Sequence, residues 1–282
     1  MTALKDRLDL MKPAVSALAA AAAAAGYTSC RPDNVHGAVQ AAAGVLLLSG
    51  GACALNNWQD RLFDSRSERT RLRPLPAGRM SPALALAESL LLAAGGTALL
   101  LGLSVYAASA GLLTAALYNS VYTPLKKRTL AALLPGILCG SLPPLIGWLA
   151  AGGGAPSSGI VYLAALFAIW QLPHLWLLAL SDAQSRPAPS FLDRLEEPLL
   201  QRLTVLWAAA FSFATLFMKV FGLVNAPAAA LLLAANAVAL PLVFLLSSLR
   251  PWDRPASRRL FRYLNASALA VTLLAAADPL YR

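Results

Sequence analysis

The chain has 282 residues, of which 58% are hydrophobic and only 13% are charged, and its mean hydropathy is +0.62. This composition excludes an ordinary soluble domain, and the charged residues cluster between long uncharged stretches, which excludes a disordered chain and a charged coiled coil. A net charge of +10 is typical of nucleic-acid-binding proteins, so the positions of the Lys and Arg residues decide what it means.

Nine hydrophobic runs follow one another along the chain, each close to the ~20 residues that a helix needs to cross a bilayer. They cover residues 13–30, 38–59, 82–101, 104–122, 130–151, 159–180, 199–220, 226–247 and 260–280. We therefore expect an all-α protein, a polytopic membrane bundle of about nine transmembrane helices forming a single domain over residues 1–282. Because prolines interrupt several runs, we also expect a central cavity among the helices. These prolines are Pro135, Pro143, Pro144, Pro173 and Pro241.

The basic residues are distributed very unequally between the two sides of such a bundle. An odd number of spans places the termini on opposite sides, and 20 of the 23 Lys and Arg residues then fall on the side of the N-terminus. Only Arg31, Lys219 and Arg282 fall on the other side. The positive-inside rule predicts a cytoplasmic N-terminus and an external C-terminus, and it explains the net charge without a nucleic-acid partner.

A polar segment with regular spacing follows the second hydrophobic run. Asn56, Asp60, Asp64 and Glu68 are each four residues apart, so they share one face if the segment is helical. Stacked acidic side chains favour a bound cation, and oxygen ligands favour Mg²⁺, which binds phosphate groups as further ligands. We predict that Asn56, Asp60 and Asp64 are the metal ligands. The alternative is a solvated helix whose acids pair with Arg61 and Arg71.

The fourth run ends in a second polar segment, where Tyr122 and Lys126 lie one helical turn apart on the side of the N-terminus. An ammonium group at this position is suited to neutralise a diphosphate, and the guanidinium groups of Arg69 and Arg73 are suited to bind its oxygens. The alternative for residues 126–128 is an anchor that fixes the topology at the inner leaflet.

The two segments together resemble a known family. Asn56, Asp60, Asp64, Arg69, Thr70, Arg73, Pro74, Leu75 and Gly78 resemble the first signature of the UbiA superfamily of intramembrane prenyltransferases. Residues 118–129, 140–148 and 170–176 resemble the sequence blocks of the branch of this superfamily that farnesylates haem. The resemblance covers about residues 10–182.

The resemblance implies a helical bundle around a cavity open to the bilayer, in which Mg²⁺ promotes ionisation of an allylic diphosphate. For this branch the donor is farnesyl diphosphate and the acceptor is a vinyl group of haem B, which is converted to haem O in the bacterial inner membrane, at its cytoplasmic side. Asp60, Asp64 and Lys126 would be catalytic. The residues implied to bind the diphosphate are Asn56, Arg69, Arg73, Tyr122 and Lys126.

The acceptor side is predicted from the sixth run and the loop after it. His174 by itself is typical of a buried core histidine, but the resemblance favours a contact of His174 with haem iron or a propionate, beside Trp170. The second acidic motif of the superfamily is reduced to Asp182, which we assign to the acceptor site.

Two other functions compete with this prediction. A prenyltransferase acting on an aromatic acid or a quinone precursor would share the diphosphate site and differ in the acceptor pocket, where a basic residue would hold the carboxylate. A transporter would place ionisable residues along a path through the middle of the membrane, whereas nearly all charges here lie at helix ends.

Overall fold

The computed structural model describes residues 2–66, 70–182 and 196–281, and all regular secondary structure within these residues is helical. The predicted all-α class is confirmed. The helices are α1 (Thr2–Leu10), α2 (Pro13–Cys30), α3 (Val35–Asp64), α4 (Pro82–Leu101), α5 (Val105–Ala116), η1 (Leu117–Tyr122), α6 (Thr123–Leu125), η2 (Leu130–Ala132), α7 (Leu133–Ser141), α8 (Pro143–Ala150), α9 (Ser158–Asp182), α10 (Glu197–Ala214), η4 (Thr215–Met218), α11 (Pro227–Ser247), α12 (Arg254–Ala277) and η5 (Asp278–Tyr281).

Seven helical segments in the described part of the chain are long and apolar enough to cross a membrane, and α1 with α2 forms an eighth span bent by 57°. The chain is an integral, multi-pass membrane protein. All nine predicted runs are helical, but the run at 104–122 is divided, because the 12 residues of α5 continue as the π-helical η1. In η1 the Thr123 amide donates to the carbonyl oxygen of Tyr118, five residues earlier, so the turn is wider than an α-helical turn.

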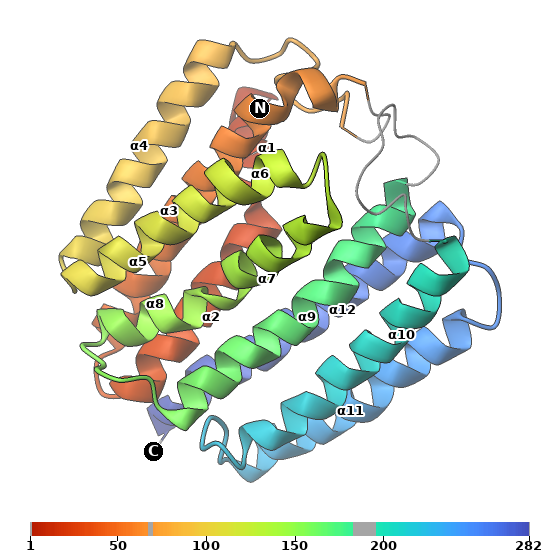
Figure 1. Ribbon diagram of the computed structural model, residues 1–282. Helices are drawn as coiled ribbons and strands as arrows, with labels where there is room; N and C mark the ends of the chain where they lie inside the picture. The colour runs from red at the N-terminus through yellow and green to blue at the C-terminus, as the bar shows by residue number, and fades with distance from the viewer. Residues whose placement is uncertain (1, 67–69, 183–195, 282) are drawn as a thin grey trace.

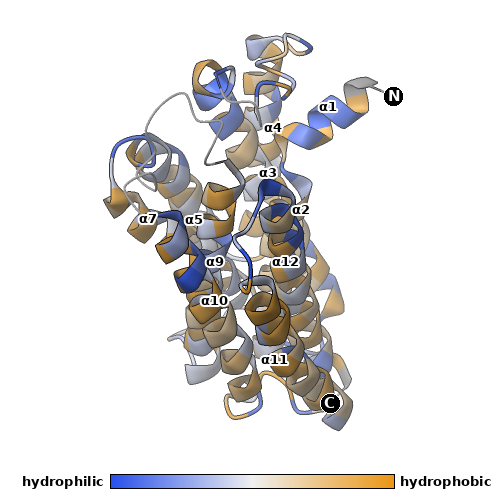
Figure 2. Cartoon of the chain, turned by 90° about the vertical axis from the view of Figure 1, so that its right-hand side faces the viewer, coloured by the Kyte–Doolittle hydropathy of each residue, from blue (hydrophilic) through white to orange (hydrophobic). Residues whose placement is uncertain are grey.

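The helices pack into two neighbouring groups (Figure 1). One apolar core lies among α2, α3, α4, α5 and α8, and a second lies among α9 to α12 with α2 at its edge. The termini lie at opposite ends of the bundle, as the odd number of runs predicts (Figures 1 and 2). Many large apolar side chains on α10 and α11 face outward, as expected for helices in contact with lipid.

Helices α2 and α8 approach each other closely because small residues face the partner backbone. A Cβ atom on Gly147 would lie 1.8 Å from the carbonyl oxygen of Ala23, and one on Gly26 would lie 1.9 Å from that of Pro144. Contacts between small residues are the usual way for membrane helices to pack tightly. This contact fixes α8, whose Pro143 and Ile146 line the central cavity.

The break between α1 and α2 lies at Lys12, which has φ 48° and ψ 66°. Lys12 is the only residue other than glycine with positive φ in the described part of the chain. Two ion pairs hold α1 against neighbouring segments, Asp6 with Arg79 at 2.9 Å and Arg7 with Glu88 at 3.0 Å. The side chain of Lys12 is thereby directed toward α3.

Candidate active site

The centre of the charged end of the bundle is Asp60, whose side chain is buried. Lys126 Nζ lies 2.6 Å from its Oδ2 atom, and Lys127 Nζ lies 2.5 Å from its Oδ1 atom. Asn56, one turn earlier on α3, donates from Nδ2 to Asp60 Oδ2 at 2.9 Å and to Thr123 Oγ1 at 3.0 Å. The predicted face of α3 and the predicted lysine segment therefore meet.

Asp64, at the end of α3, binds a different cation. Arg73 Nη1 donates to its Oδ2 atom at 2.7 Å, and the hydroxyl of Thr70 donates to its backbone carbonyl oxygen at 2.9 Å. These two bonds fold the loop after α3 back onto the helix. Asp64 does not pair with Arg61, whose guanidinium group donates instead to the carbonyl oxygen of Trp58 at 2.7 Å. The alternative pairing of Arg71 with Glu68 lies outside the described residues. Glu68 and Arg69 lie outside the described residues.

Lys12 also belongs to the charged residues around Asn56, Asp60 and Asp64. From its position in the sequence it is expected only to help fix the membrane topology. Its ammonium group donates to Asn56 Oδ1 at 2.7 Å and to the hydroxyl of Tyr118 at 3.3 Å. Lys12 thus contacts the face of α3 that carries the predicted metal ligands, at Asn56, one turn before the residue that Lys126 contacts. The one signal in the sequence is its position directly before Pro13, at the start of the first hydrophobic run.

The polar end of the bundle carries more positive than negative charge. Lys12, Arg73, Lys126 and Lys127 surround the two carboxylates of Asp60 and Asp64, which leaves an excess of two positive charges in this cluster. Burial lowers the pKa of Lys126, and the adjacent Asp60 carboxylate acts in the opposite direction. An excess of ammonium and guanidinium groups in a half-buried site favours binding of a polyanion such as a diphosphate.

The donor atoms at this site also fit a hard divalent cation. They are the carboxylates of Asp60 and Asp64 and the amide oxygen of Asn56, all on one face of α3. Within the described residues no three His, Cys, Asp or Glu side chains come together as a metal site. One or two protein carboxylates are what Mg²⁺ typically uses when water and substrate phosphates supply its other ligands.

Tyr122 lies beneath the lysines, with its ring centroid 5.6 Å from Lys126 Nζ and stacked on Tyr118 at 5.5 Å. The predicted proximity of Tyr122 and Lys126 is therefore observed. Asp182 is the last residue of α9, and its side chain lies outside the described residues.

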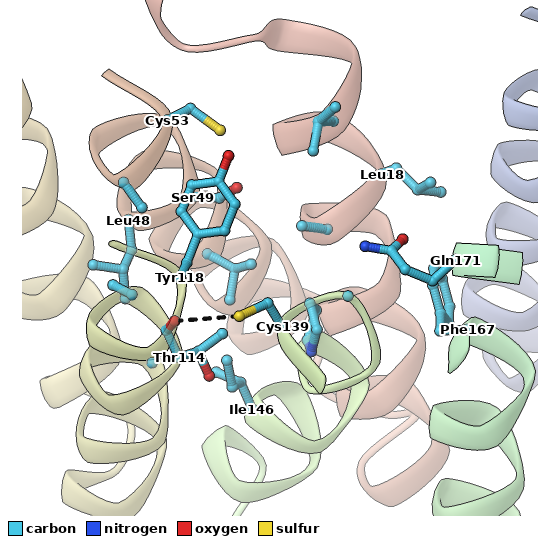
Figure 3. Close-up of a pocket in the computed structure, with 18 of the residues that line it drawn as sticks. Leu18, Leu48, Ser49, Cys53, Thr114, Tyr118, Cys139, Ile146, Phe167 and Gln171 are labelled. Carbon is cyan, nitrogen blue, oxygen red and sulfur yellow. Dashed lines mark hydrogen bonds between the residues drawn. The ribbon is translucent and has the colours of Figure 1, made fainter. Parts of the chain in front are cut away.

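A largely apolar cavity adjoins the charged cluster at Tyr118, which contacts Lys12 and lines the cavity. Figure 3 shows residues of its lining. Tyr118 and Cys53 line the end near Asn56, and Thr114 and Cys139 lie deeper, where Cys139 Sγ donates to the Thr114 carbonyl oxygen at 3.9 Å. The cavity extends to α9, where Trp170 and His174 form its wall. A single cavity therefore connects the charged cluster with the residues predicted for the acceptor.

His174 is buried in this wall, where it contacts two aromatic rings. Its ring centroid lies 4.6 Å from that of Trp170 and 4.9 Å from that of Phe261 on α12. Its Nδ1 atom lies 3.0 Å from Oδ1 of Asn265, also on α12. The contacts of His174 with Phe261 and Asn265 are not evident from the sequence, because both residues are far from His174 in the chain and lie in an apolar run.

The chain is similar in sequence to known proteins. Residues 14–269 match the sequence profile of the UbiA prenyltransferase family. A protoheme IX farnesyltransferase of Geobacter sulfurreducens is 39% identical over 276 residues, covering 93% of this chain and 95% of that protein. One of Myxococcus xanthus is 42% identical over 183 residues, covering 64% and 61%.

Two solved structures have the same fold. An apo UbiA homologue from Aeropyrum pernix superposes with a TM-score of 0.72 at 23% identity, covering 93% of this chain and 96% of that one. A UbiA homologue from Archaeoglobus fulgidus bound to GPP and Mg²⁺ superposes with a TM-score of 0.63 at 14% identity, covering 96% and 99%. From the profile match and the full-length relative, the chain belongs to the UbiA prenyltransferase family.

Proposed function

We propose that the protein transfers the farnesyl group of farnesyl diphosphate to a vinyl group of haem B and so produces haem O. The observation that carries this proposal is the single cavity that reaches from the cationic cluster at Tyr118 to the aromatic wall at His174. The relative from Geobacter sulfurreducens, named a protoheme IX farnesyltransferase and aligned over nearly the whole chain, supports the same reaction.

The donor diphosphate binds at the charged end of the bundle. Lys126, Lys127, Arg73 and Lys12 contact its oxygens, and its farnesyl chain extends into the apolar cavity. Tyr122 and Arg69 are predicted from the sequence to bind the same diphosphate, and Arg69 lies outside the described residues. In the structure, each of these four cations is paired with an oxygen atom of Asp60, Asp64 or Asn56. When the diphosphate binds, its oxygens replace these protein oxygens as the partners of the cations.

Asp60, Asp64 and Asn56 hold Mg²⁺, which neutralises part of the negative charge on the leaving diphosphate. The A. fulgidus homologue bound to GPP and Mg²⁺ supports this assignment.

Catalysis by the chain's own residues is electrostatic. As the bond between C1 of the farnesyl group and the diphosphate oxygen breaks, Lys126 and its neighbours stabilise the charge that develops on the diphosphate. The apolar cavity walls keep water away from the allylic cation until its C1 atom bonds to the terminal vinyl carbon of haem. A water molecule then adds to the inner vinyl carbon, which carries the positive charge, and loses a proton to give the hydroxyethylfarnesyl group.

A prenyltransferase acting on an aromatic acid is disfavoured by the lining of the cavity. Such an acceptor needs a cation for its carboxylate, and none of the described residues that line the cavity is Lys or Arg. We further propose that the chain is a single domain over residues 1–282. It would lie in a bacterial inner membrane with the N-terminus and the diphosphate site on the cytoplasmic side and the C-terminus outside.

The experiment that tests the function is product analysis by mass spectrometry. Purified protein in lipid is incubated with Mg²⁺, farnesyl diphosphate and either haem B or 4-hydroxybenzoate, and the Asp60→Asn variant is the matched control. We expect farnesylated haem from the native protein, at least about 100-fold less from the variant, and no prenylated benzoate. Prenylated benzoate in place of farnesylated haem would contradict the proposal.

A further inference from the structure

One face of α9 supplies polar side chains to the wall of the largely apolar cavity. Phe167, Trp170, Gln171 and His174 lie three or four residues apart, as a helical face requires, and all four line the cavity. Trp170 Nε1 and Gln171 Oε1 are buried, and neither has a hydrogen-bond partner within residues 2–66, 70–182 and 196–281. Figure 3 shows the Gln171 side chain extending into the cavity. An unpaired buried donor and acceptor each carry a cost of ~1–3 kcal/mol, which a ligand with matching groups removes.

The hydrogen bond between His174 and Asn265 determines which ring nitrogen of His174 is free. Asn265 Nδ2 donates to the backbone carbonyl oxygen of Phe261 at 2.5 Å, so the amide presents its Oδ1 atom to the imidazole. Since an amide oxygen only accepts hydrogen bonds, His174 Nδ1 must carry the proton. The neutral imidazole then has its lone pair on Nε2.

The ring of His174 is also fixed in place. Trp170 and Phe261 both pack against it, with centroid distances of 4.6 and 4.9 Å. A neutral imidazole whose Nδ1–H is bound by an oxygen and whose orientation is fixed is the typical arrangement of a histidine that ligates a metal through Nε2.

We propose that this wall of the cavity is the acceptor site and that His174 Nε2 is an axial ligand of the haem iron, with Asn265 as its positioning residue. Trp170 Nε1 and Gln171 Oε1 supply a hydrogen-bond donor and an acceptor to the same ligand or to its ordered water. The identification of this ligand as haem rests on the proposed function. Ligation holds the porphyrin in the cavity that also receives the farnesyl chain, and the iron takes no part in bond formation.

The chain allows a direct spectroscopic test because it contains only two histidines, and the other one, His36, is exposed near the start of α3. In the His36→Ala variant, purified with a tag free of histidine and labelled with ¹⁵N-histidine, His174 is the only labelled imidazole. Ferric haem B is added to this protein in lipid nanodiscs. We expect electron-nuclear double resonance to detect ¹⁵N coupled to the iron. Absence of this coupling in bound haem overturns the proposal, and the result does not depend on whether a His174 variant folds.

Three variants extend the test to the positioning residue. We expect His174→Gly to bind haem B at least tenfold more weakly and to regain the native Soret band when imidazole is added. Asn265→Asp keeps an acceptor for Nδ1–H and should retain the native spectrum, whereas Asn265→Leu should weaken haem binding several-fold. His36→Ala is the matched control and should match the native protein. Haem affinity of His174→Gly within twofold of native would overturn the ligand assignment.

Product formation separates this proposal from the proposed function. Native protein that farnesylates haem while showing no ¹⁵N coupling rejects His174 as the ligand and leaves the reaction intact. Native protein that shows the coupling but makes no farnesylated haem under any Mg²⁺ condition rejects the reaction and supports the haem site.

Discussion

Replacing Lys12 by Gln tests whether the break between α1 and α2 contributes to the diphosphate site. The ammonium group of Lys12 lies 2.7 Å from Asn56 Oδ1 and is one of four cations beside two carboxylates. The substitution removes one charge-assisted hydrogen bond to the diphosphate, worth ~1.5–3 kcal/mol. At about 1.4 kcal/mol per factor of ten, binding should weaken roughly 10- to 100-fold.

The assay is calorimetric titration of the protein in detergent with farnesyl thiolodiphosphate, an analogue that resists ionisation, in the presence of Mg²⁺. Lys12→Arg should bind nearly as well as the native protein because the charge is kept. Lys5→Gln on the exposed side of α1 is the matched control and should have no effect.

Lys12→Gly separates charge from backbone strain. Glycine relieves the ~1–2 kcal/mol cost of the left-handed conformation at Lys12, so this variant should be at least as thermally stable as Lys12→Gln, yet bind the analogue equally weakly. Native-like affinity in Lys12→Gln and Lys12→Gly would refute the assignment of Lys12 to the site.

Three further predictions concern the metal site and the helix packing. Asp60→Asn and Asp64→Asn should each lower Mg²⁺-dependent turnover by about two orders of magnitude or more at unchanged folded yield, and full turnover in both would exclude them as metal ligands. Chelation of Mg²⁺ with EDTA should abolish product formation, and added Mg²⁺ should restore it; turnover that persists in EDTA would contradict a divalent-metal requirement. Gly147→Ala should destabilise the protein by ~1–3 kcal/mol, seen as a lower midpoint of thermal unfolding, because its Cβ atom would lie 1.8 Å from the Ala23 carbonyl oxygen. Gly154→Ala, where no atom lies within 4 Å of the added Cβ, should unfold at the native temperature.

The sequence predicts the parts of the site that depend on local spacing. Asp60 and Asp64 are four residues apart on one helix, so their common face follows from helical geometry alone. Lys126 is predicted as a site residue by its position at the end of a hydrophobic run, and in the structure it contacts Asp60, a pairing that the sequence does not predict. The long apolar runs likewise predict the helices of the bundle.

Contacts that depend on tertiary structure are not evident from the sequence. Lys12 reaches Asn56 across 44 positions only because a single residue adopts a left-handed backbone conformation between two helices. Asn265 meets His174 across 91 positions through the packing of α12 on α9, and neither residue lies in a motif that requires the other. The π-helical turn that divides the run at 104–122 is also invisible to hydropathy, since it changes hydrogen bonding without changing composition.

This wide turn affects how the family can vary in length. An α-helix advances about 100° per residue, and a π-helical turn contains one residue more than an α-helical turn, so η1 acts as a one-residue insertion between α5 and α6. In a relative lacking that residue the turn would be α-helical, and the lysines that follow would keep their orientation relative to the Thr114 side of α5, because the wide turn accommodates the extra residue without rotating the next segment. Alignments of this region should therefore tolerate a gap of one residue between Thr114 and Lys126 more readily than a gap within α3.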